Sequence, residues 1–158
     1  MTPRADLEEL LAQYRAALDA QLALLEQLEA VAARQREQTD ARNFERLAVA
    51  SDERDTLTRS LVTIEQGLAE VRQQLTQSRA EVIRMPQFAG VLERRRTAAE
   101  VVARILETDQ ESMRSLADAE LARRAALAHL ERGGTTLAAY RKVLTPPVSN
   151  AALLDRRG

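Results

Sequence analysis

The stretch Thr39-Asp40-Ala41-Arg42-Asn43 decides how this sequence folds, because it separates two ladders of mainly apolar residues that do not share one register. The first ladder steps alternately by four and three residues, which is an a/d heptad pattern. It consists of Leu7, Leu11, Tyr14, Leu18, Gln21, Leu25, Leu28 and Ala32. Continued past the break, it falls on the polar residues Thr56, Ser60 and Thr63. The next leucines therefore lie one residue out of register, which is about 100° of helix rotation.

One straight helix cannot keep both ladders on a single face, so the sequence predicts a helix boundary at residues 39–43. The second ladder consists of Leu57, Leu61, Ile64, Leu68, Val71, Leu75, Ser78 and Val82. Asp40 or Thr39 is the expected N-cap of the second helix. A short connection makes the two helices antiparallel neighbours. The alternative is one continuous helix with a skip in its heptads.

Prolines and glycines mark the other boundaries. Helices are expected over residues 3–38, 41–84 and 88–132, because Pro3 suits a first turn, Pro86 stops the second helix and Gly133-Gly134 end the third. The third ladder is expected at Val102, Leu106, Asp109, Met113, Leu116, Glu120, Arg123, Leu127 and Leu130. Within it, Glu120 and Arg123 are spaced to pair. The sequence thus predicts an all-α fold: an elongated, coiled-coil-like antiparallel three-helix bundle over residues 1–133, with a short amphipathic helix and tail over 134–158.

The composition narrows the class of protein. Apolar residues make up 45% of the chain and charged residues 30%, whereas aromatic residues make up 3%, and there is no Trp and no Cys. Such a chain is typical of long-helix bundles. A net charge of −1 gives no basic field for nucleic acid or for a membrane surface. No apolar run approaches the roughly 20 residues that span a bilayer, and the N-terminus lacks a signal sequence, so a cytoplasmic protein is expected.

The sequence contains no recognisable catalytic, cofactor or metal-binding pattern. A Gly-rich phosphate loop, a nucleophile elbow and a cluster of metal ligands are all absent. The single histidine, His129, is expected on a solvated helix face. The neighbours Glu53, Arg54 and Asp55 should point around their helix rather than into one site. The triplet Arg94–Arg96 is expected in solvent or in ion pairs between helices. We therefore expect no enzyme, no cofactor and no bound metal.

The segment after Gly133-Gly134 differs from the long helices. Residues 135–144 form an amphipathic pattern of about ten residues, which is too short for a stable helix alone in water. It must therefore dock either on its own bundle or on a partner, and both alternatives stay open. The candidate partner-binding residues are Leu137, Tyr140, Val143, Leu144, Leu153 and Leu154.

Two stretches resemble a known family. Residues 40–47, Asp-Ala-Arg-Asn-Phe-Glu-Arg-Leu, followed by the charged step 52–57, resemble the start of the second helix in flagellar type III export chaperones of the FlgN and FliT type. The ending is similar as well, with a glycine after the last long helix, Ala139-Tyr140, and the closing residues 153–158, Leu-Leu-Asp-Arg-Arg-Gly. The doubled glycine and Pro146-Pro147 depart from the family pattern.

The resemblance implies a cytosolic chaperone that binds the terminal helix of a late axial export substrate, either a hook-associated or a filament-cap protein. It implies that the chaperone prevents premature assembly and aids delivery to the export apparatus, whose components are further partners. Neither nucleic acid nor membrane insertion is expected, and a homodimer in the absence of the client is a further option. The competing interpretation is a coiled-coil scaffold or oligomerisation module with no export role.

Overall fold

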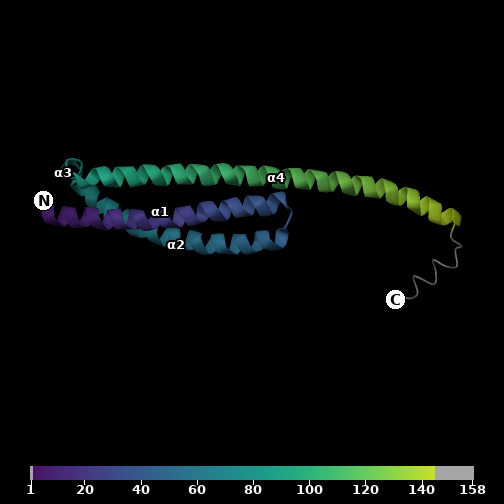
Figure 1. Cartoon of the computed structure of the whole chain (residues 1–158), viewed down its shortest axis with the longest axis horizontal. Coiled ribbons are helices and arrows are strands. Elements are labelled where there is room, and N and C mark those ends of the chain that lie inside the picture. The colour runs from purple at the N-terminus through teal and green to yellow at the C-terminus, as the bar shows by residue number, and fades with distance from the viewer. Residues whose placement is uncertain (1, 145–158) are drawn as a thin grey trace. The chain divides into compact units, whose positions relative to one another are not determined.

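The computed structural model describes the backbone of residues 2–144 and the side chains of residues 2–132. All its elements are helices: α1 (Arg4–Asp40), α2 (Phe44–Gln77), α3 (Arg79–Val82) and α4 (Gln87–Leu144), as Figure 1 shows. The predicted all-helical fold is confirmed for this part of the chain. The chain divides into two compact units, Met1–Ser115 and Leu116–Gly158, which are described separately below.

The turn between α1 and α2 lies where the sequence placed it, but its capping residues differ from those predicted. Thr39 and Asp40 belong to the last turn of α1, and Asn43 is the N-cap of α2, with its side chain accepting a hydrogen bond from the Arg46 N–H. The α1 helix ends in a Schellman motif, in which the Asn43 N–H donates to the Gln38 carbonyl at 2.8 Å and Arg42 has a φ of 55°. Thr39 is unavailable as an N-cap because its buried hydroxyl donates to the Gln35 carbonyl.

Helices α1 and α2 are antiparallel, which rules out the alternative of one continuous helix. The Arg34 guanidinium contacts the Glu53 carboxylate at 2.8 Å near the turn. Further from the turn, Gln21 donates to Glu65 at 2.9 Å. Partner numbers thus fall along α1 as they rise along α2, as expected for two helices joined by a short turn.

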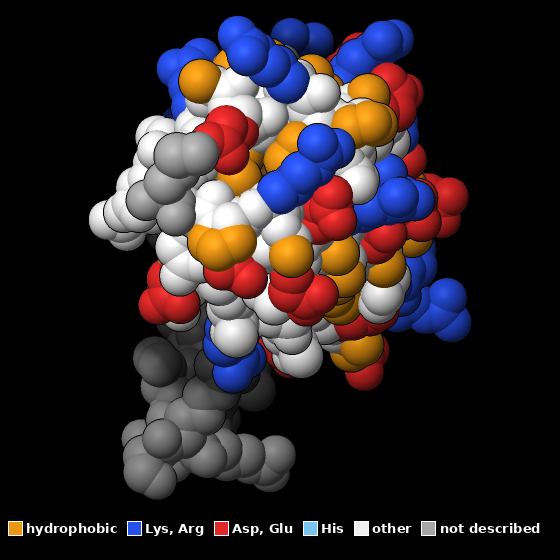
Figure 2. Space-filling view, turned by 90° about the vertical axis from the view of Figure 1, so that its left-hand side faces the viewer, with side chains coloured by type: hydrophobic (Ala, Val, Ile, Leu, Met, Phe, Trp, Pro, Cys, Tyr) orange, Lys and Arg blue, Asp and Glu red, His pale blue; other side chains and the backbone are white. Residues whose placement is uncertain are grey.

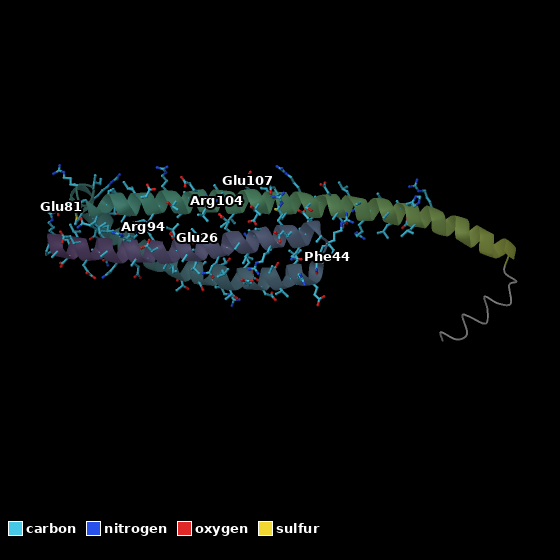
Figure 3. The ribbon with its side chains drawn as sticks, in the orientation of Figure 1. Glu26, Phe44, Glu81, Arg94, Arg104 and Glu107 are labelled. Atoms are coloured by element: carbon cyan, nitrogen blue, oxygen red, sulfur yellow. The ribbon has the colours of Figure 1, made fainter. Side chains whose placement is uncertain are left out.

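The first part of α4 runs parallel to α1 in a constant register. Arg94 contacts Asp19 at 2.6 Å, and Arg104 contacts Glu29 at 2.9 Å. In each of these pairs the partners are 75 residues apart in sequence, and the same separation recurs where Ser115 donates to Asp40. Figure 3 labels Arg94 and Arg104 on α4 alongside α1. An unchanging offset means that the two helices do not slip relative to each other over this length.

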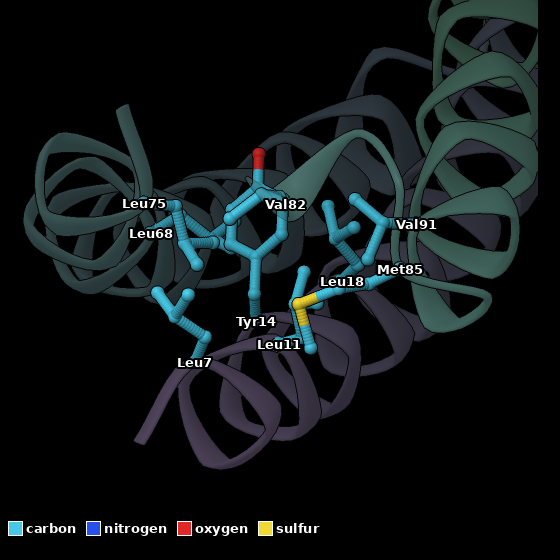
Figure 4. Close-up of a cluster of buried hydrophobic side chains, with 9 residues drawn as sticks. All are labelled: Leu7, Leu11, Tyr14, Leu18, Leu68, Leu75, Val82, Met85 and Val91. Carbon is cyan, nitrogen blue, oxygen red and sulfur yellow. The ribbon is translucent and has the colours of Figure 1, made fainter. Parts of the chain in front are cut away.

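Two buried clusters hold the first unit together. One cluster, drawn in Figure 4, brings α1 residues against α2, the α3 region and the start of α4. Its members are Leu7, Leu11, Tyr14, Leu18, Leu68, Leu75, Val82, Met85 and Val91. The other joins α1 to α4 through Leu25, Leu28, Ala32, Ala98, Val101 and Ile105. These clusters contain every member of the ladder predicted for the first helix except Gln21, which donates to Glu65 at the surface. Each fully buried leucine contributes about 1.5–3 kcal/mol to folding.

The second helix ends earlier than predicted. Instead of continuing to residue 84, α2 stops at Gln77, and the chain resumes helix for the four residues of α3. The break is at Ser78, whose φ of −118° and ψ of 33° leave the helical region. Its hydroxyl meets that of Thr2 at 3.4 Å. The prediction for the end of α2 was therefore wrong, because no proline or glycine marks this position.

The ladder predicted for the third helix is wrong by one residue. The residues of α4 that face α1 are Val91, Ala98, Val101 and Ile105, which are all buried. Those that the sequence placed in the core, beginning with Val102 and Leu106, lie on the surface. The error has a physical cause, since α4 carries two apolar ladders one residue apart. The ladder through Ala98, Val101 and Ile105 is the one that packs against α1.

The predicted end of the third helix at residue 132 is also wrong. The α4 helix continues through Gly133-Gly134 to Leu144, so residues 134–144 belong to it and are not a separate short helix. Each glycine inside a helix costs about 1 kcal/mol relative to alanine, which weakens a helix without forbidding it. Within the second unit, the predicted pair is confirmed, because the Glu120 carboxylate contacts Arg123 at 2.8 Å and also Arg124 at 3.1 Å.

Candidate functional site

The partner-binding residues predicted from the sequence are not described by the structure. Leu137, Tyr140, Val143 and Leu144 lie on the α4 backbone, but their side chains are outside the described residues, as are Leu153 and Leu154 entirely. Their role therefore stays a prediction.

An apolar surface that the sequence had assigned to the core lies uncovered on α4 in the first unit. We call it the α4 stripe and define it as Val102, Leu106 and Met113, whose exposed fractions are 39%, 56% and 70%. Their spacing follows the heptad pattern of a helix-pairing seam. Apolar side chains aligned in this way on the surface mark an interaction site more often than isolated ones do.

An ion pair interrupts the α4 stripe between Leu106 and Met113. The Arg54 guanidinium, from α2, donates two hydrogen bonds to the Asp109 carboxylate, at 2.7 Å from Nη1 and 2.6 Å from Nη2. The hydrogen bond with Asp109 raises the pKa of Arg54, although partial burial acts in the opposite direction. The carboxylate on this face of α4 is therefore neutralised by a fixed partner and does not repel an apolar helix as a free charge would.

The same arginine connects all three long helices. Arg54 Nη1 also donates to the Gln35 side-chain oxygen of α1 at 2.7 Å, and Gln35 in turn donates to the Ser51 hydroxyl at 3.1 Å. Every member of this network is only partly buried. The network fixes the position of α2 relative to the α4 stripe, so the surface beside the stripe is preorganised.

Several charged residues that the sequence singled out lie as predicted. Glu53 pairs with Arg34 of α1 whereas its neighbour Arg54 turns to α4, so these side chains diverge. Arg94 binds Asp19 between helices, and Arg96 pairs with Glu100 on its own helix. His129 is exposed on α4.

Among the described residues, no group of His, Cys, Asp and Glu is arranged to hold a metal ion, and no described helix is long and apolar enough to cross a bilayer.

The second unit, taken by itself, also exposes apolar side chains on α4. The described side chains of residues 121–132 are all exposed. Large apolar side chains on its surface are Leu116, Leu121, Leu127 and Leu130. A helix that exposes leucines at this density is suited to packing against another helix. Sequence reasoning had identified most of these residues but assigned them to the chain's own core.

The α4 stripe offers a second helix an apolar surface, and the Arg54–Asp109 pair divides this surface between Leu106 and Met113. It provides no converging nucleophile, base and acid on the described residues. Comparison with known proteins adds nothing further, because no protein-family model, no curated protein and no solved structure matches this chain.

Proposed function

We propose that this chain is a non-catalytic flagellar export chaperone of the cytoplasm, which holds the terminal amphipathic helix of a late axial substrate. The observation that carries the proposal is the α4 stripe, whose exposed residues keep heptad spacing with no helix of the first unit covering them. The resemblance of residues 40–57 and 153–158 to chaperones of the FlgN and FliT type supports the choice of client.

The finer architecture belongs to the same proposal. Antiparallel α1 and α2, with the first part of α4 parallel to α1, are consistent with an elongated antiparallel three-helix bundle. In such a bundle, a client helix would lie along α4 by helix-in-groove packing, with anchor residues every three or four positions. The client helix would pack against other subunits in the assembled axial structure, and before export its apolar face makes it prone to aggregation. Covering that face keeps the client monomeric.

The test uses synthetic peptides that correspond to the terminal helices of hook-associated and filament-cap subunits. Isothermal titration calorimetry with the full chain should give 1:1 binding of at least one peptide. Leu106→Glu combined with Met113→Glu should weaken that binding at least about tenfold, which corresponds to about 1.4 kcal/mol. Both residues are exposed, so the helix content measured by circular dichroism should not change.

Val49→Glu combined with Val62→Glu is the matched control. Val49 and Val62 are apolar residues of α2 that are 65% and 52% exposed, so the double substitution adds the same two negative charges to a surface outside the α4 stripe. Its affinity for the peptide should equal that of the unmodified chain. Absence of binding to every peptide would overturn the proposed function, whereas equal affinities for the three proteins would remove the α4 stripe as the site.

The alternative function, a coiled-coil scaffold, is favoured by the same observation, because a second copy of the chain could cover the stripe. Light scattering at micromolar concentration separates the two functions. A chaperone should give a 1:1 complex with its client, dissolving any homodimer that exists before the client is added. A scaffold should instead keep one symmetric assembly in the presence of every peptide, and Leu106→Glu should dissociate it.

The tail residues predicted from the sequence enter the proposal separately. Deleting residues 134–158 removes Leu137, Tyr140, Val143, Leu144, Leu153 and Leu154. If the segment covers the client surface, client affinity should rise after the deletion, and if it clamps the client, affinity should fall. An unchanged affinity would contradict both roles.

A further inference from the structure

A second, distinct surface lies in the first unit, where α1 and α2 meet α3 and the start of α4. It is a groove of about 460 Å³, which we call the α3 groove. Its inner lining includes the buried ring of Tyr14, together with the half-buried ring of Phe88. Ile83 and Leu92 line it as exposed apolar side chains. Figure 4 shows the Tyr14 hydroxyl pointing away from α1, beside Val82.

The charged residues that line the α3 groove all have one sign. Arg72 of α2, Arg79 of α3 and Arg95 of α4 line it, and no Asp or Glu is among its lining residues. Figure 2 views this end of the molecule and shows apolar side chains at the surface among both basic and acidic side chains, so the single sign of charge is a property of the groove lining alone. A chain with a net charge of −1 has therefore gathered cations from three helices around one apolar hollow.

Two of these arginines are not used by the fold. Arg72 is engaged, since it donates to the Tyr14 hydroxyl at 3.3 Å and to Glu65 at 3.1 Å. Arg79 and Arg95, in contrast, form no ion pair with any residue for which the structure describes a side chain. Their neighbour Arg94 does pair across to α1, so an unpaired arginine is not a general property of this part of α4.

We infer that the α3 groove binds a short acidic, amphipathic peptide segment of a partner protein, with an apolar side chain in the groove and carboxylates on Arg79 and Arg95. Guanidinium groups bind carboxylates through paired hydrogen bonds, which makes arginine the preferred residue for such contacts. A volume of about 460 Å³ lies within the usual range for a small binding site and is too small for a long helix. This inference does not depend on the proposed chaperone function.

A peptide fits this surface better than an anionic lipid. The two unpaired arginines lie on different helices, Arg79 on α3 and Arg95 on α4, which suits a ligand with several carboxylates on one backbone rather than a single headgroup. The apolar lining is also interrupted by Thr76, whose polar side chain disfavours a continuous acyl chain. The lipid alternative is nevertheless included as an outcome of the test.

The experiment exploits the fact that the sequence contains only two phenylalanines, Phe44 and Phe88. Full-length protein labelled with 4-fluorophenylalanine gives a ¹⁹F signal from the α3 groove and one from the exposed start of α2. The probe is the capped peptide Glu-Glu-Leu-Phe-Glu-Glu. It should shift the Phe88 signal without shifting that of Phe44, and its affinity should fall as salt is raised.

Matched peptides and variants decide the chemistry. The peptide Gln-Gln-Leu-Phe-Gln-Gln should bind at least about tenfold more weakly, since it lacks the carboxylates. Arg79→Gln with Arg95→Gln should remove the difference between the two peptides. Arg114→Gln, which removes an exposed arginine of α4 outside the groove, should preserve it. The peptide Glu-Glu-Ala-Ala-Glu-Glu should also bind at least about tenfold more weakly, because nothing fills the groove.

Three results would overturn the inference. These are equal affinity for the Glu and Gln peptides, unchanged affinity in the Arg79 and Arg95 double variant, and a Phe88 shift produced by phosphatidylglycerol vesicles but not by the acidic peptide. None of them bears on client binding at the α4 stripe, so failure of either proposal leaves the other testable.

Discussion

Arg54 of α2 holds Asp109 of α4 by two hydrogen bonds, of 2.7 and 2.6 Å, in the middle of the exposed apolar stripe. Arg54→Ala should lower the free energy of unfolding by about 1–2 kcal/mol, because a charge-assisted pair is lost and Asp109 keeps no such partner. Asp109→Ala and the double variant complete a cycle, measured by urea unfolding. A coupling energy of about 1 kcal/mol is expected. Additive single effects would contradict a direct interaction.

In the turn after α1, Arg42 adopts a left-handed backbone conformation that favours glycine. Arg42 takes a φ of 55°, a conformation that glycine adopts without steric penalty. Arg42→Gly should therefore raise the free energy of unfolding by about 0.5–1 kcal/mol. The control is Arg42→Ala, which removes the same charge but keeps a Cβ atom, and it should give no such gain. Equal effects of the two substitutions in thermal unfolding would show that charge, not backbone conformation, is responsible.

Because α4 continues through Gly133-Gly134, replacing either glycine by alanine should stabilise the helix. If the helix ended there, the same replacement should destabilise it. Inside a helix, Gly133→Ala and Gly134→Ala should each stabilise the helical state by about 1 kcal/mol and increase helix content. At a left-handed C-terminal position, the same substitutions would destabilise the helix end. Circular dichroism at low temperature, with Gly67→Ala in the interior of α2 as a reference, distinguishes the two. Reduced helix content would restore the boundary expected from the sequence.

The second unit should respond to acid through Glu120. Its pKa is lowered from 4.5 to about 2, chiefly by the hydrogen bond from Arg123, while desolvation opposes the shift and Arg124 adds to it. Because the folded-state pKa is the lower one, the stabilisation is fully present above about pH 4.5 and is lost as the pH falls towards 2. Cα chemical shifts of residues 116–132 should therefore lose helical character across this window.

Glu120→Gln serves as the control for that titration. The amide cannot ionise, so the Arg123 and Arg124 contacts should be weaker at neutral pH, and the helical shifts should change less between pH 5 and 2. An identical acid response in both proteins would assign the effect to other carboxylates.

The buried face of a helix could be predicted from the sequence where one apolar ladder was clearly more complete than any other on that helix. On α1 the ladder from Leu7 to Ala32 is more complete than the neighbouring row of Leu10, Leu24 and Val31, so the burial of its apolar members was predicted correctly. On α4 two ladders lie side by side, one through Val101 and the other through Val102, and periodicity alone does not rank them. The ladder through Val101 is buried by packing against Leu25 and Leu28 of α1, which are distant in sequence.

The α3 groove was missed for a related reason. Its arginines Arg72, Arg79 and Arg95 are spread over three helices, and the break at Ser78 separates the first two of these helices where the pattern predicted one continuous helix. No local motif announces a helix end at Ser78. By contrast, the divergence of Glu53 and Arg54 could be predicted, because adjacent residues on a helix point in different directions. An ion pair between helices was likewise among the predictions for Arg94.

The constant offset of 75 residues between α1 and α4 constrains how this gene can change in length. A single codon deleted from α4 between Arg94 and Val101 would rotate everything after it by about 100°. Val102 and Leu106 would then take the inward positions, and the contacts of Arg104 and Ser115 would be lost together. Homologous chains should therefore accept insertions and deletions mainly at the turn around residues 41–43. Within the part of α4 that runs along α1, up to Ser115, length should change only in whole heptads, matched by an equal change in α1.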